Sequence, residues 1–190
     1  RNERDGTTLR WVGPGSYQDG DGMHFPRRDF PFERGFFISK HEISVSQFEE
    51  FLRQRSEERE RRTITLHRPD GTDYVYTLKD QDPAIYVSWE DANRYCEWAG
   101  LRLPSGAEWG YAAQGGDGRK FPWGNEAPSA ERLNLADKGA EWSPTVQRGI
   151  DRRAAWTDGY SVLAPVDSFP LGASPWGCLN MCGNVREWTD

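Results

Sequence analysis

The sequence predicts an α+β domain with short antiparallel strands, two to three short helices and long ordered loops. Three features support this class: strand-like aromatic runs near the start, capped amphipathic helix patterns in the middle, and a long aperiodic segment after Gly116 that is rich in Gly, Pro, Asp and Asn. A chain of 190 residues can bury one substantial core and is marginal for two. We therefore expect a single domain over residues 1–190.

Two strand regions are expected at the start of the chain, at residues 9–22 and 30–39. Residues 63–78 alternate in character around the turn sequence PDGTD and predict a β-hairpin. A charged run, SEERERR, precedes the hairpin, and we expect it to be solvent-exposed. We interpret residues 54–82, the charged run plus the hairpin, as an insertion.

The stretch 85–116 predicts two helices in succession. Ser88 caps the first, with Asp91 placed to return the hydrogen bond, and Gly100 stands where a left-handed C-terminal residue is favoured. Ser105 and Glu108 repeat the capping pattern for the second. A third capped helix is expected earlier, with Ser44 as its cap, Gln47 at the reciprocal position, and an apolar side formed by Val45, Phe48, Phe51 and Leu52.

Composition excludes several classes of protein. Net charge is −6 and the basic residues are scattered, which argues against a nucleic-acid partner. Mean hydropathy is −0.86 and no apolar run approaches the ~20 residues of a membrane span, so we expect a soluble protein. Three cysteines, an odd count, slightly favour the cytoplasm without establishing a compartment. Nine tryptophans indicate a core filled by large rings.

The aperiodic segment after Gly116 carries too many aromatic rings to remain in water, so we expect ordered loop. Compact irregular backbone commonly needs a stabilising ligand, and its Asn and Asp residues suggest calcium.

Four motifs occur in order: VSWEDANRYCEWAGLRLPSGAEWGYAA, FPWGN, APVDSFP and MCGNVREWTD. Together they resemble the formylglycine-generating enzyme, or sulfatase-modifying factor, family, whose domain is a variant of the C-type lectin fold. The resemblance runs from about residue 9 to residue 190, leaves the 54–82 region largely uncovered, and implies a domain truncated at its C-terminal end.

The resemblance implies copper-dependent oxidation of a sulfatase cysteine, with copper held by two cysteines that follow the GNVxEW motif. Only Thr189 and Asp190 follow it here, so no catalytic residue is assigned, and copper enters only if residues beyond Asp190 supply the pair. Cys96 is expected to be a small buried residue on a helix face. Cys178 and Cys182 could form a disulfide or bind a soft metal, but are more simply part of a loop.

Two departures from the family pattern argue against catalysis. Arg186 replaces a tryptophan that lines the oxidase pocket, and an ionised guanidinium cannot provide the same apolar wall. Gly106 and Gly110 replace two glutamates in a helix, which we interpret as relaxed positions.

Two structural calcium sites are implied by the resemblance. The first would use the side chains of Asn134 and Asp158 with the carbonyls of Leu135 and Tyr160. The second would use the side chains of Asn180 and Glu187 with the carbonyls of Gly183 and Val185. All are hard oxygen donors, as calcium prefers. From the residues alone, Asn180 and Glu187 could equally well hydrogen-bond loop backbone.

The sequence therefore favours a non-catalytic ligand- or protein-binding, regulatory module on a calcium-stabilised lectin-type scaffold. We expect it to belong to a larger protein, of the kind that retroelements can diversify, and its ligand is a protein or small molecule of unknown identity. The alternative is a copper-dependent formylglycine-generating oxidase whose cysteine pair lies beyond Asp190. A third reading, a sulfoxide synthase of thiol-histidine biosynthesis, would need an additional iron-binding domain.

Overall fold

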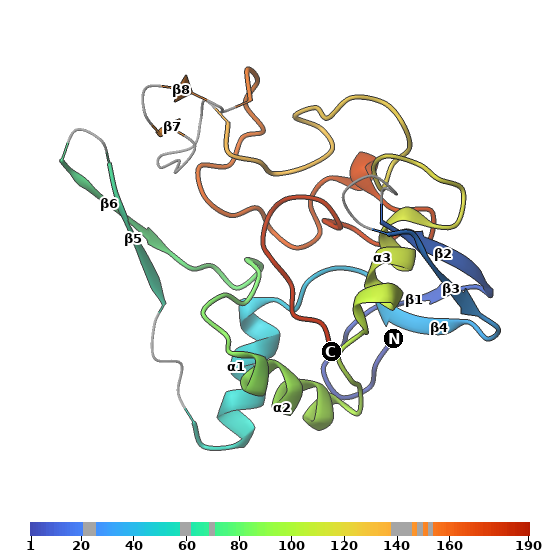
Figure 1. Ribbon diagram of the computed structural model, residues 1–190. Coiled ribbons are helices and arrows are strands. Elements are labelled where there is room, and N and C mark those ends of the chain that lie inside the picture. Colours follow the sequence, from blue (N-terminus) through green and yellow to red (C-terminus); the bar gives the residue numbers. More distant parts are fainter. Residues whose placement is uncertain (21–25, 58–61, 69–70, 138–145, 148–149, 152–153) are drawn as a thin grey trace.

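A computed structural model describes residues 1–20, 26–57, 62–68, 71–137, 146–147, 150–151 and 154–190 (Figure 1). Within these ranges, short antiparallel strand pairs accompany three helices, which confirms the α+β class. The helices are α1 (Val45–Gln54), α2 (Trp89–Ala99) and α3 (Gly106–Gln114), with a 3-10 turn at Pro170–Gly172. The strands are β1 (Leu9–Val12), β2 (Gly15–Asp19), β3 (Arg28–Phe32), β4 (Phe36–Ser39), β5 (Thr63–His67), β6 (Asp73–Thr77), β7 (Val146–Gln147) and β8 (Ile150–Asp151).

All three predicted helices are present with the predicted caps. The side chains of Ser44 and Ser105 accept the backbone N–H three residues on, and the third residue returns the bond in a full capping box. In α2 the pattern is only half fulfilled, because Asp91 accepts the Ser88 hydroxyl at 2.7 Å instead of the cap backbone. Gly100 ends α2 in the left-handed conformation, with φ of 72°.

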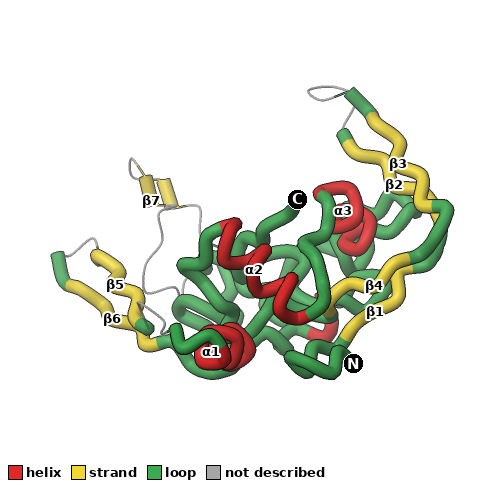
Figure 2. Tube along the Cα trace, turned by 90° about the horizontal axis from the view of Figure 1, so that it is seen from below, coloured by secondary structure: helices red, strands yellow, loops and turns green. Residues whose placement is uncertain are grey.

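The strands form four antiparallel pairs: β1 with β4, β2 with β3, β5 with β6, and β7 with β8. Figure 2 shows β1–β4 and β2–β3 on one side of the molecule and β5–β6 on the other, with the helices between them. The hairpin predicted at residues 63–78 is confirmed as β5–β6 and projects from the body. The charged run before it and the hairpin turn lie partly outside the described residues, at 58–61 and 69–70.

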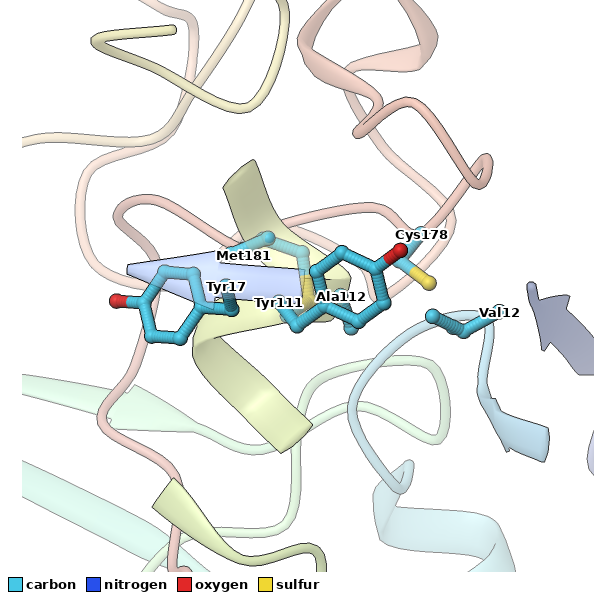
Figure 3. Packing of buried hydrophobic residues seen from close by; sticks show 7 residues of the cluster. Val12, Tyr17, Tyr111, Ala112, Cys178 and Met181 are labelled. Carbon is cyan, nitrogen blue, oxygen red and sulfur yellow. The ribbon is translucent and has the colours of Figure 1, made fainter. Parts of the chain in front are cut away.

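Aromatic rings fill the core, as the composition predicts. Tyr111 of α3 stacks on Phe32 of β3 with ring centroids 4.8 Å apart, in a cluster that also holds Tyr17 and Met181 (Figure 3). A second cluster joins α1 to α2 through rings that include Phe51 and Tyr95, 5.6 Å apart. These contacts fix the helices against the strands without a continuous sheet.

The long segment predicted to be ordered loop is tied to the body by backbone hydrogen bonds. Val166 donates to the carbonyl of Gln81 at 2.9 Å, and Leu179 donates to that of Lys40 at 2.7 Å. Its only helical turn in the described ranges is the 3-10 turn, but it also contains the short β7–β8 pair that the sequence did not indicate. None of the helices described is long and apolar enough to cross a bilayer.

Gly110 is not a relaxed position, contrary to the sequence interpretation. It is buried in α3 beside β2, and a Cβ atom there would lie 2.6 Å from the Tyr17 ring. A Cβ on Gly106 would meet nothing within 4 Å. One of the two glycines is therefore required by close packing, and the other is tolerated at the helix start.

These two glycines form a matched pair for mutation. We expect Gly110→Ala to lower the free energy of unfolding by about 1–3 kcal/mol, because the Tyr17 ring must move within a packed core. Gly106→Ala should raise it by about 0.5 kcal/mol through reduced chain entropy. Thermal unfolding measures both, at about 2–4 °C per kcal/mol for a chain of this size. Equal effects of the two substitutions would contradict the packing argument.

Candidate functional site

A cavity of about 630 Å³ lies between strand β4, helix α2, the loop that follows α2, and the segment that contains residues 185–188. Most of its lining is apolar, including Phe36, Ile38, Leu101 and Leu103. Cavities of this size and character are typical of small-molecule or peptide sites. The few polar groups in its wall therefore decide what it can bind.

Three charged side chains of the wall have no ion-pair partner among the described residues: Glu42, Arg186 and Glu187. By contrast, Arg102 is held by a bidentate bond to Glu108, with contacts of 2.7 and 2.6 Å. Arg186 is exposed and forms no hydrogen bond within the described ranges. Its guanidinium is therefore available to a ligand.

Two indole groups anchor the segment that carries Arg186. The Trp188 Nε1 donates to the carbonyl of Val87 at 2.9 Å, and the Trp89 Nε1 donates to that of Thr189 at 3.1 Å. Both bonds join the end of the described chain to the start of α2. They fix the cavity wall at residues 185–188 against a helix.

The second predicted calcium group lies at the inner end of this wall. Asn180 is 5% exposed, and its side-chain N–H groups donate to Glu42 Oε2 at 2.8 Å and to the carbonyl of Val166 at 3.1 Å. Its Oδ1 is buried and has no partner among the described residues. A buried unpaired amide oxygen is costly and marks a position where a cation would fit.

Glu42 and Glu187 are close enough to influence each other. Burial raises the pKa of Glu42 to about 7, while bonds from Asn180 and Asn184 act in the opposite direction. Desolvation of its carboxyl group raises the pKa of Glu187 to about 8, although the residue as a whole is exposed, and the negative charge of Glu42 contributes to that increase. Two neighbouring carboxylates without a basic partner in the described ranges form an electronegative site that a cation would neutralise.

The residues of the first predicted calcium group are also close together. The Asp158 carboxylate accepts the backbone N–H of Leu135 at 3.0 Å and that of Tyr160 at 2.9 Å. Asn134, 6% exposed, donates to the carbonyl of Val162. Asp137, which the sequence did not indicate, is fully buried and accepts the Asp158 N–H at 2.5 Å.

Glu42 was also not among the residues that the sequence indicated. The available signal was its position, an acidic residue among apolar neighbours just before the cap of α1. An acidic residue is seldom fully buried unless it has partners. Within the described ranges, no group of three or more His, Cys, Asp or Glu side chains is placed to hold a metal on its own. Any cation at either site must therefore take amide and backbone oxygens as well.

All three cysteines are free thiols, so the alternative of a Cys178–Cys182 disulfide is wrong. Burial raises the pKa of the Cys96 and Cys178 thiols to about 11 and also raises that of Cys182. Because the thiolate is the metal ligand and the nucleophile, none of the three is activated at neutral pH. Cys96 lies partly buried on α2, in agreement with a packing role.

The whole chain matches the model of a known protein family. The model of the sulfatase-modifying factor enzyme 1-like domain matches residues 1–190, and the chain belongs to this family. The expectation drawn from the four motifs is thus confirmed.

Curated relatives include proteins named as formylglycine-generating enzymes and others named as inactive forms. The formylglycine-generating enzyme of Mus musculus is 40% identical over 122 residues, which are 64% of this chain and 30% of the relative. The inactive C-alpha-formylglycine-generating enzyme 2 of Bos taurus is also 40% identical over 122 residues, covering 64% of this chain and 36% of the relative. The matched part is thus about a third of the length of these relatives.

Among solved structures, PvdO from Pseudomonas aeruginosa is similar over the whole chain. The TM-score is 0.70 at 22% identity, and the match covers 72% of that protein. At this level of identity the likeness establishes the fold alone, and it supports the predicted architecture.

Proposed function

We propose that this domain is a ligand-binding module of the sulfatase-modifying factor family that does not itself catalyse oxidation. The observation that carries the proposal is the largely apolar cavity of about 630 Å³, with the unpaired guanidinium of Arg186 in its wall. An apolar cavity with a few fixed polar groups suits a small molecule or a protein segment. Burial raises the pKa of all three thiols, and the described residues contain no group of three or more His, Cys, Asp or Glu side chains placed to hold a metal.

An inactive relative at 40% identity supports this proposal. The bovine protein is named as an inactive C-alpha-formylglycine-generating enzyme. A scaffold of this kind can persist without the reaction, because fold and chemistry are separable. We extend that possibility to this chain because of Arg186 and the raised thiol pKa values.

The cavity can be tested with a neutral apolar dye such as N-phenyl-1-naphthylamine. We expect Leu101→Trp, which places a larger ring in the cavity wall, to weaken dye binding at least tenfold by fluorescence titration. Leu171→Trp is the matched control, because Leu171 is 57% exposed outside the cavity wall. Equal dye affinity in the two variants, with unchanged melting temperatures, would exclude the cavity as the binding site.

The alternative, a copper-dependent formylglycine-generating oxidase, is supported by the active relatives. The decisive experiment uses the full natural protein, loaded with copper and incubated with a peptide that carries the sulfatase cysteine motif. The binding-module proposal expects no mass loss from the peptide in a mass spectrum. Conversion at a rate comparable to that of a known family enzyme would establish the oxidase and overturn the binding-module proposal.

We further propose that calcium stabilises the loops of this domain. The second site would be held by Asn180 and Glu187 side chains with the Gly183 and Val185 carbonyls, and the buried, unpaired Asn180 Oδ1 supports that assignment. The first site would use Asn134, Leu135, Asp158 and Tyr160. The hydrogen bonds from the backbone N–H groups of Leu135 and Tyr160 to the Asp158 carboxylate support this assignment, because they bring three of the four residues together. Bound calcium supplies charge neutralisation and a fixed set of oxygen contacts, and waters would complete its coordination.

Calcium removal tests both sites. At a calcium concentration 100 times the Kd, one site adds about 2.7 kcal/mol, so a chelator should lower the melting temperature by about 5–10 °C. Asn180→Ala should remove the contribution of the second site and leave that of the first. Glu50→Gln, on the exposed side of α1, should leave it intact. A melting temperature that is the same with calcium and with chelator would contradict both sites.

A further inference from the structure

A continuous chain of side-chain hydrogen bonds joins the two proposed cation sites. Asn134 of the first site donates from Nδ2 to Asn184 Oδ1 at 2.9 Å. Asn184 donates from its own Nδ2 to Glu42 Oε1 at 2.9 Å. Asn180 of the second site donates to the other carboxylate oxygen of Glu42, Oε2, at 2.8 Å. Glu42 and Asn184 belong to neither of the predicted ligand sets.

Glu42 determines which way the Asn180 amide faces. In its ionised form this side chain offers only acceptors, so the Asn180 side chain must turn its NH₂ group toward it. The second N–H of that group is taken by the carbonyl of Val166. Asn180 Oδ1 is consequently turned away from these partners, and it is the buried atom that has no partner in the described part of the chain.

Asn184 fixes Glu42 from the other side. Its Nδ2 also donates to the carbonyl of Ala164 at 3.1 Å, and its Oδ1 accepts the Ala164 N–H at 3.0 Å. With the bond from Asn134, the amide has a partner for each of its donors and acceptors. Its backbone has a φ of 54° and donates to the Asn134 carbonyl at 2.9 Å. A saturated amide in a fixed loop cannot turn over without losing several bonds.

We propose that Glu42 is a positioning residue of the second cation site, which orients Asn180 Oδ1 toward the cation while Asn184 holds Glu42 in register with the first site. This inference rests on the calcium sites proposed above. Groups that orient metal ligands typically change metal affinity by 10–100-fold when they are removed. The carboxylate is 6% exposed, so water cannot substitute for it easily.

Glu42→Gln is the sharpest test because it keeps the shape and removes one acceptor. The glutamine carbonyl can satisfy only one of the two asparagine NH₂ groups, and its own NH₂ then faces the other. Asn184 is locked by Ala164, so the Asn180 amide is the group that must turn. Turning it presents an N–H to the cation in place of Oδ1.

The measurement is calcium binding by isothermal titration calorimetry on the whole chain. It is repeated in an Asp158→Ala background, in which the second site alone contributes. We expect Glu42→Gln to raise the second-site Kd at least tenfold, and to reduce the melting-temperature difference between calcium and chelator. Glu42→Asp keeps both acceptors but withdraws them by one methylene group, so it should bind calcium more tightly than Glu42→Gln and less tightly than the unmodified chain. The control, Glu50→Gln, should retain the original Kd.

Other outcomes distinguish the positioning role of Glu42 from the calcium sites on which it rests. If Glu42→Gln lowers the melting temperature equally with and without calcium and leaves the Kd within twofold, Glu42 is only structural and the inference fails while the calcium sites stand. If the unmodified chain binds no calcium, the sites and the inference fail together. If Glu42→Gln does not fold, the comparison of Glu42→Asp with the unmodified chain decides, and an unchanged Kd overturns the inference.

Discussion

The carboxylate of Glu42 organises the half of this domain that has no regular secondary structure. It stands just before α1 and accepts hydrogen bonds from Asn180 and Asn184, which are 138 and 142 residues further along the chain. A buried charge is stable only when its acceptors are filled, and here two loop asparagines fill them. The left-handed backbone of both asparagines, with φ near 55°, is held in place by the same contacts.

The cavity depends on that arrangement. Its wall at residues 185–188 comes directly after the loop that holds Asn180 and Asn184. The indoles of Trp89 and Trp188 anchor this wall to α2. The contacts that stabilise this loop therefore also fix the shape of the cavity wall. A cation beside Glu187 would neutralise that carboxylate, which leaves Arg186 as the exposed charged side chain of the wall that has no ion-pair partner in the described part of the chain.

Local signals predicted the helices well, because a capped amphipathic helix is specified within about a dozen residues. Ser44, Ser88 and Ser105 all cap as expected, and the β5–β6 hairpin follows from its turn. The motif match also indicated Asn180, which lies buried and hydrogen-bonded to Glu42. The prediction for Gly110 was wrong because the residue that it contacts, Tyr17, lies in strand β2. The sequence of the helix itself carries no sign of that contact.

The sequence by itself determined the fold class, the three helices and their caps, and membership in the sulfatase-modifying factor family. Only the tertiary structure decided which acidic residue holds the loops together, which amide oxygen remains unpaired, and where the cavity lies. The physical reason is the separation along the chain between the residues that interact. Caps and turns depend on neighbours three or four residues apart, whereas the partners of Glu42 are more than 130 residues away and meet it only after the chain has folded.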